Sequence, residues 1–250
     1  MINFLKNRKK RKLVIWLASI ILTLAILVGA CAIYLSDYYR ADLGAIATMS
    51  FGEDFEQIEL EDESIAFVPT DIKAGFIFYP GGKVEHSAYI PLMRAMAQEG
   101  ILCIIARMPF NLAVLDIDAA QELRELYPSL NEWYIGGHSL GGSMAASHLE
   151  DFFADYKGLV LLGSYSTTDL NGKGLRALSI YGSEDKVMDA ESYKSNKSNL
   201  PSDLVEIIID GGNHAYFGVY GKQDGDGGAL ISNFEQITRT SRSICEFILG

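Results

Sequence analysis

Short apolar segments alternate with amphipathic ones from residue 56 onward. Eight segments rich in apolar residues predict β-strands over 57–60, 64–68, 75–79, 102–106, 133–136, 158–162, 177–181 and 204–209. Apolar residues spaced three and four apart predict helices over 88–99, 113–126, 140–153 and 231–249. Strands that alternate with helices indicate an α/β fold, with a mostly parallel sheet covered by helices on both faces. We expect a single domain over 56–250.

The first 35 residues follow a different pattern. Residues 6–12 carry six cations, whereas 13–35 are uncharged and mostly apolar. A helix rises about 1.5 Å per residue, so 13–35 is long enough to cross a hydrocarbon layer of about 30 Å. We expect a cytoplasmic basic segment over 1–12, a transmembrane helix over 13–35 and a linker over 36–55. Because cations favour the cytoplasmic side, the main domain is expected outside the cell membrane.

Two alternatives for this segment remain open. The small residues Ala30-Cys31-Ala32 resemble a signal-peptide cleavage site, and Val28-Gly29-Ala30-Cys31 resembles a lipoprotein lipidation site. Both alternatives also place the domain at the outer face.

Charge and cysteine content argue against several classes of partner. Without the six N-terminal cations, 21 basic residues fall to 15, against 32 acidic residues, which gives a formal charge of −17. Such a domain repels nucleic acid and anionic lipid. Cys31, Cys103 and Cys245 form neither a disulfide framework nor a metal-binding spacing, so we expect no metal and no cofactor.

A Gly-x-Ser-x-Gly pattern, Gly137 to Gly141, lies between the predicted strand 133–136 and the predicted helix 140–153. This is the context of a nucleophile elbow, a sharp turn whose glycines avoid collisions with the neighbouring strand and helix. The turn places Ser139 at the helix N-terminus, where unpaired amides favour negative charge. We expect Ser139 to be a nucleophile and the Leu140 amide to be an oxyanion donor.

A serine nucleophile needs a base and an acid that orients the base, and both follow in the chain. Glu184 and Asp185 come just after the strand 177–181, and His214 comes just after the strand 204–209. We expect Asp185, rather than Glu184, to orient His214 as the general base. The other histidines are weaker candidates because of their positions: His86, His138 and His148.

The sequence indicates different roles for three further loops. The loop after the strand 75–79 should supply a second oxyanion donor, the amide of Gly82 or Lys83. Residues 108–112 either shape a substrate pocket on the same rim or merely connect two elements. Segment 221–228 is too rich in glycine for a helix or strand, and it lacks the full calcium-binding pattern despite two aspartates; we expect a flexible loop.

From about residue 56 to its end, the chain resembles the α/β-hydrolase superfamily, and more narrowly the small bacterial hydrolases of the Abhydrolase_5 and dienelactone-hydrolase-like type. The motifs that carry this resemblance are Tyr79-Pro-Gly-Gly-Lys-Val, Gly137-His-Ser-Leu-Gly-Gly, Tyr181-Gly-Ser-Glu-Asp and Gly211-Gly-Asn-His-Ala-Tyr-Phe-Gly. The resemblance implies an α/β-hydrolase fold with Ser139, Asp185 and His214 as nucleophile, acid and base. Dienelactone hydrolases use a cysteine nucleophile, so Ser139 argues against that substrate.

The sequence therefore predicts a membrane-anchored, carboxylesterase-like serine hydrolase. Its substrate is expected to be a small-molecule or lipid-like ester or thioester, cleaved through an acyl-enzyme on Ser139. Residues 165–176 leave no room for a large helical cap, which favours an open site. Two alternatives remain: an anchored binding protein that keeps the fold without catalysis, and a peptidase or acyltransferase that acts on cell-envelope material.

Overall fold

The computed structural model describes residues 2–52 and 54–250, which divide into one unit up to Tyr38 and a second over Tyr39–Gly250. The first unit is mainly the helix α1 (Ile2–Ser36). Within it, Arg11–Ser36 is long and apolar enough to cross a membrane, with a mean hydropathy of 2.7. Its apolar side chains, such as Ile21 and Val28, are exposed rather than packed in a core. The predicted span, 13–35, falls inside this helix.

The second unit is built on one eight-stranded sheet in the order β1-β2-β4-β3-β5-β6-β7-β8. The strands are β1 (Phe55–Glu59), β2 (Ile65–Pro69), β3 (Ala74–Tyr79), β4 (Ile101–Ile105), β5 (Trp133–His138), β6 (Gly158–Leu162), β7 (Arg176–Gly182) and β8 (Val205–Ile209). Strand β2 runs antiparallel to both of its neighbours, and every other pair is parallel. The carboxyl ends of β5, β6, β7 and β8 therefore meet at one edge of the sheet.

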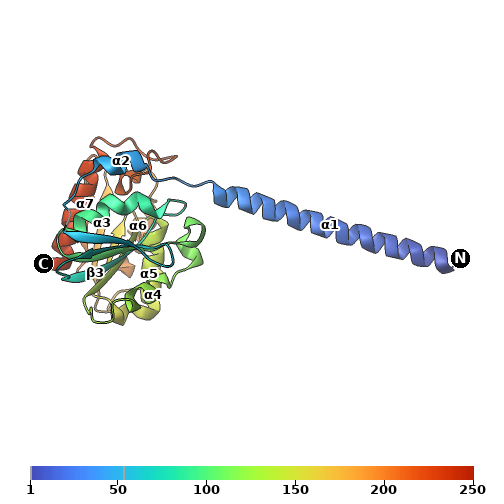
Figure 1. The fold of residues 1–250 in the computed structure, drawn as a ribbon, viewed down its shortest axis with the longest axis horizontal. Coiled ribbons are helices and arrows are strands. Elements are labelled where there is room, and N and C mark those ends of the chain that lie inside the picture. Colours follow the sequence, from blue (N-terminus) through green and yellow to red (C-terminus); the bar gives the residue numbers. More distant parts are fainter. Residues whose placement is uncertain (1, 53) are drawn as a thin grey trace. The chain divides into compact units, whose positions relative to one another are not determined.

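Helices cover both faces of this sheet (Figure 1). They are α2 (Leu43–Thr48), α3 (Ile90–Ala97), α4 (Ala119–Glu125), α5 (Leu140–Phe152), α6 (Ala190–Asn196) and α7 (Asn233–Leu249). Alternate residues of β3 belong to two separate cores: Phe76 and Phe78 pack with α3 and α7, whereas Ile77 and Tyr79 pack with α4 and α5. Burial on both faces explains why the central strands are continuously apolar in sequence. The predicted α/β class is confirmed.

The structure breaks the predicted helix 113–126 into two pieces. A short 3-10 helix covers Ala113–Leu115, and α4 begins only at Ala119. At the break, the hydroxyl of Tyr79 donates to the carbonyl of Ile117 at 2.7 Å and accepts from the amide of Ala120 at 2.9 Å. This side chain on β3 replaces the helical hydrogen bonds, so the helical spacing alone could not locate the break.

The second unit begins at Tyr39, earlier than the boundary at residue 56 that the sequence pattern suggested. The amide of Tyr39 donates to the carbonyl of Lys83 at 2.8 Å, and its carbonyl accepts from Glu85 at 2.9 Å. The amide of Asp42 donates to the carbonyl of Val219, also at 2.8 Å. Part of the predicted linker thus packs against the loops that follow β3 and β8.

Candidate active site

Ser139 connects β5 directly to α5, at the carboxyl edge of the sheet. Its φ of 52° and ψ of −124° lie in a region that side-chain-bearing residues seldom occupy. The turn is held from β6, because the Ser139 amide donates to the carbonyl of Leu162 at 2.9 Å and its carbonyl accepts from the hydroxyl of Ser164 at 2.7 Å. A Cβ atom at Gly141 would collide with the carbonyl oxygens of Tyr79 and Pro80. These contacts produce the sharp strand-to-helix turn of a nucleophile elbow.

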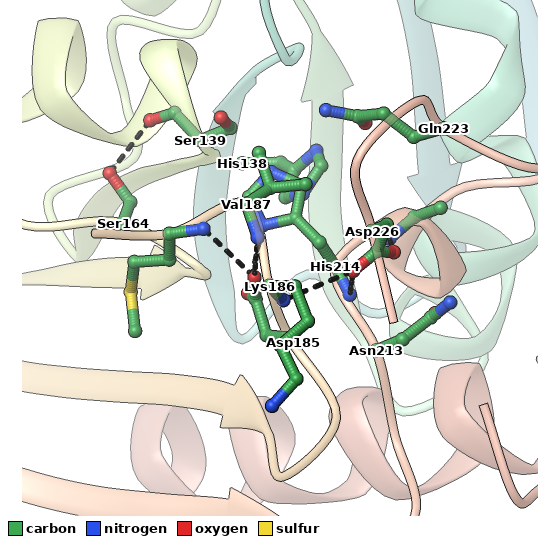
Figure 2. A network of polar contacts seen from close by, with 12 residues as sticks. His138, Ser139, Ser164, Asp185, Lys186, Val187, Asn213, His214, Gln223 and Asp226 are labelled. Carbon is green, nitrogen blue, oxygen red and sulfur yellow. Dashed lines mark hydrogen bonds and ion pairs between the residues drawn. The ribbon is translucent and has the colours of Figure 1, made fainter. Parts of the chain in front are cut away.

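Asp185 and His214 lie in direct contact at the same edge. Nδ1 of His214 and Oδ2 of Asp185 are 2.8 Å apart, and both side chains are almost fully buried (Figure 2). The other oxygen of Asp185 accepts from the amides of Val187 and Met188, at 2.9 Å each. A carboxylate fixed in this way keeps the proton on Nδ1 of His214, which leaves the lone pair on Nε2 for accepting a proton.

His138, the residue directly before Ser139, links the elbow to His214. The rings of His138 and His214 have centroids 4.4 Å apart, so the residue that precedes Ser139 packs on the imidazole. Within the described residues, Nε2 of His214 has no hydrogen-bond partner, and the hydroxyl of Ser139 does not reach it. A long serine–histidine contact is common in ligand-free enzymes.

The loop after β3 and the start of α5 supply the candidate oxyanion donors. Gly82 faces Leu140 closely: a Cβ atom there would lie 2.9 Å from Cδ2 of Leu140. Among the described residues, neither of their two amides donates to an acceptor. The amide of Lys83, in contrast, donates to the carbonyl of Asn111 at 2.8 Å. Of the two residues predicted from this loop, the structure therefore favours Gly82 and not Lys83.

His138 forms a buried link between the base and this loop. Its Nδ1 lies 2.8 Å from the hydroxyl of Tyr89, which also accepts the amide of Gly81 at 3.1 Å. If Tyr89 gives its proton to Nδ1, the ring proton of His138 lies on Nε2. Burial, and secondly the adjacent His214, lower the pKa of His138 well below its usual value. A neutral ring thus packs against the candidate base. No sequence motif indicated a role for Tyr89 in the site, because this residue falls in a predicted helix.

The remaining histidines lie away from these contacts. Nε2 of His86 lies 3.1 Å from the carbonyl of Glu63. Nδ1 of His148 lies 2.9 Å from a carboxylate oxygen of Asp118, on the α4–α5 side of the sheet. Neither ring touches Ser139, so His214 is the only histidine paired with a buried carboxylate at the elbow among the described residues.

Segment 221–228 is a loop, as its glycine content predicts, but Asp226 is not placed as a cation ligand. Its two carboxylate oxygens accept backbone amides instead. In the described part of the chain, no three His, Cys, Asp or Glu side chains converge to hold a metal ion.

The segment after β4 lies beside the loop of Gly82, through the bond between Asn111 and Lys83. Phe110 and Asn111 both have positive φ angles, and Phe110 points to solvent with 59% of its surface exposed. Val114 and Leu115 are exposed nearby in sequence. The segment after β4 thus contacts the loop of Gly82 and carries exposed apolar side chains on either side of that contact in the sequence.

Comparisons with known proteins agree with this architecture. A sequence model of the alpha/beta hydrolase family, Abhydrolase_5, matches residues 75–238. No curated protein matches the chain in sequence. Among solved structures, protein TT1662 from Thermus thermophilus is 15% identical with a TM-score of 0.57, covering 78% of this chain and 98% of its own.

Two further structures share the fold. A protein from Thermoplasma acidophilum described as a CIB-like hydrolase is 14% identical with a TM-score of 0.55, over 78% of this chain and 100% of its own. The esterase domain of a Rhodothermus marinus protein is also 14% identical with a TM-score of 0.55, over 77% and 96%. At such identities these likenesses establish the fold.

Proposed function

The chain belongs to the alpha/beta hydrolase family, and from this premise we propose that it is a serine hydrolase that cleaves a carboxylic ester or thioester. The observation that carries the proposal is the 2.8 Å contact between Asp185 and His214, which leaves Nε2 of a buried imidazole unpaired beside the Ser139 turn. A buried polar atom without a partner is costly, and a catalytic role is one reason why a fold keeps such an atom. Among the described residues, Nε2 of His214 is one of several such atoms, and it belongs to the ring that a buried carboxylate holds beside Ser139.

In the proposed reaction, Nε2 of His214 removes the proton of Ser139 as the serine oxygen attacks the substrate carbonyl. Asp185 keeps the resulting imidazolium oriented and stabilises its charge. The amides of Leu140 and Gly82 donate to the oxyanion, which develops where the two residues face each other. His214 then protonates the leaving alcohol or thiol, and water repeats the sequence on the acyl-enzyme to release the acid.

An uncapped site and an apolar rim favour a substrate with a small or extended acyl chain. In the described chain, no helix interrupts the connection between β6 and β7, where a lid could lie. The exposed side chains of Phe110, Val114 and Leu115 offer apolar contact to an acyl group. The ester-cleaving domain from Rhodothermus marinus, which shares the fold, is consistent with this substrate class.

Steady-state and burst kinetics test the reaction class. We expect the full-length protein in detergent micelles to release p-nitrophenol from p-nitrophenyl butyrate with an initial burst, and to act far more slowly on the matching anilide. Ser139→Ala should remove both the burst and the turnover. Faster anilide cleavage would favour a peptidase, and the absence of hydrolysis in a folded protein would favour a non-catalytic binding role.

We further propose that α1 anchors the protein in the cell membrane, with the hydrolase domain on the outer face. The apolar Arg11–Ser36 stretch supports this orientation, because four cations at 6–10 precede it and two more, Arg11 and Lys12, begin it. Carbonate extraction should leave the chain in the membrane fraction, and protease added to spheroplasts should digest the domain. A soluble product whose mass shows cleavage near residue 31 would contradict the anchor.

A further inference from the structure

The glycine-rich segment 221–228 ends against the two loops that carry Asp185 and His214. Figure 2 shows Asp226 of this segment reaching toward both loops. Its Oδ1 accepts from the amides of Gly227 at 2.8 Å, His214 at 3.3 Å and Lys186 at 3.3 Å. Its Oδ2 accepts from the amide of Ala215 at 2.9 Å. One carboxylate thus receives four backbone donors.

Three of these four donors belong to the candidate catalytic loops. Lys186 directly follows Asp185, and the other two donors are His214 itself and the residue after it. A carboxylate that only ordered its own turn would use nearby amides, as Asp226 does with Gly227. The donors at positions 186, 214 and 215 lie 40, 12 and 11 residues away in the chain. The side chain therefore joins three separate segments.

The segment that carries Asp226 is itself fixed in place. The side-chain amide of Asn213 donates to the carbonyl of Gly227 at 2.8 Å. A Cβ atom at Gly227 would collide with the carbonyl of Glu184, so the segment lies directly on the Asp185 loop. The hydroxyl of Tyr220 donates to the side chain of Gln223 at 3.0 Å. Asp226 can thus hold the two loops against a supported backbone.

We propose that Asp226 is a positioning residue that keeps Asp185 and His214 at hydrogen-bonding distance. A charged carboxylate forms stronger hydrogen bonds to backbone amides than a neutral group does, and it offers acceptors at both oxygens. Asparagine keeps the shape but has one acceptor oxygen, so its amino group would face at least one backbone donor. The role rests on the proposed hydrolase function, because positioning matters only if the pair acts in catalysis.

Asp226→Asn in the full-length protein in detergent micelles tests this role, with Asp224→Asn as the matched control. Asp224 lies in the same segment and its side chain is exposed. Among the described residues, only its backbone amide is hydrogen-bonded, to the hydroxyl of Tyr39. The measurements are kcat and KM for p-nitrophenyl butyrate, and hydrogen exchange of segments 183–188 and 211–218. Asp226→Asn is also combined with Asp185→Asn.

We expect Asp226→Asn to lower kcat on the order of 10²-fold, because misplacement of a reacting group by about 1 Å has that effect. KM should stay within about twofold, since substrate binding is untouched. Hydrogen exchange should become faster in segments 183–188 and 211–218 and nowhere else. Asp224→Asn should change neither kcat nor hydrogen exchange. In the Asp185→Asn variant, Asp226→Asn should lower kcat by a much smaller factor, because both carboxylates act through His214.

An unchanged kcat in Asp226→Asn would overturn the proposal, even if exchange rises. Faster exchange throughout the chain, or additive losses in the double variant, would also overturn it by showing a general loss of stability. Failure of the proposed function looks different, because the unsubstituted protein would then show no Ser139-dependent hydrolysis. In that case the positioning role fails with it.

Discussion

Ser139 has a backbone conformation that glycine adopts with less strain than any other residue, with φ 52° and ψ −124°. Such strain costs on the order of 1–3 kcal/mol and persists only when surrounding contacts enforce it. Here those contacts come from Leu162 and Ser164 on and after β6. The fold keeps a serine where glycine would be more stable, as expected if the hydroxyl is used.

Two inactive variants of Ser139 should separate strain from function. We expect the free energy of unfolding of Ser139→Gly to be about 1 kcal/mol higher than that of Ser139→Ala, because glycine adopts a positive φ with less strain. Urea unfolding of both variants measures this difference, and neither should hydrolyse esters. A glycine variant less stable than the alanine variant would show that the turn stores no strain.

Gly82 should be intolerant of a side chain because of its distance to Leu140. A Cβ atom 2.9 Å from Cδ2 and 3.3 Å from Cβ of Leu140 requires a shift of the Leu140 side chain or of the loop that carries the candidate oxyanion donor. Loss of one such donor lowers kcat on the order of 10²-fold, which we expect for Gly82→Ala. Leu140→Ala should partly restore kcat in the double variant, since it removes the collision and keeps the backbone amide. No recovery would place the oxyanion site elsewhere.

At the scale of elements, the strands were the most predictable part of the fold. The strand predicted over 158–162 matches β6, and every other strand boundary lies within two residues of its prediction. The central strands are buried on both faces and are therefore apolar along their whole length. The prediction of one continuous helix over 113–126 was wrong, because the hydroxyl of Tyr79, which is distant in sequence, stabilises a break. Helices α2 and α6 were not predicted, since six or seven residues carry little periodicity.

Some residues of the candidate site could be predicted from the sequence, and others could not. Ser139, Asp185 and His214 follow from motifs at strand ends, and their catalytic roles stay predictions until tested. From the sequence, Asp226 was only one of two aspartates in an incomplete calcium-binding pattern, within an expected flexible loop. Its contacts are backbone amides, which no sequence motif encodes. The sequence pattern does not determine which distant backbone amides a side chain contacts.

Helix α7 holds the His214 loop through Gln236, which is fully buried. Its side chain accepts the amide of Asn213 at 3.0 Å and donates to the carbonyl of the same residue at 2.7 Å. Gln236→Leu should leave both buried groups unpaired and lower the free energy of unfolding by about 2–4 kcal/mol. Chemical denaturation checks this value, with exposed Arg242→Leu on the same helix as the control. Equal stability of the two variants would contradict the role of α7.

At the scale of the whole molecule, buried histidines should make stability depend on pH. His138 is completely buried, and burial lowers its pKa in the folded protein. Below the unfolded value of about 6.5 the unfolded chain binds a proton that the folded chain excludes, so stability is present above pH 6.5 and is lost as the pH falls.

We expect His138→Asn to reduce this loss by about 1 kcal/mol between pH 6.5 and pH 5.5. Asparagine can still accept a hydrogen bond from Tyr89 but does not titrate. Unfolding by urea at the two pH values, followed by the fluorescence of buried Trp133, measures the difference. An identical pH dependence in the variant would show that His138 is protonated in the folded state.

Covalent labelling shows whether Ser139 is an activated nucleophile. The full-length protein in detergent micelles is treated with a fluorophosphonate and its intact mass is measured, beside Ser139→Ala and His214→Ala. The account predicts one adduct, located on Ser139, in the unsubstituted protein and none in either variant. A folded protein that remains unlabelled, or an adduct that persists in Ser139→Ala, would contradict it.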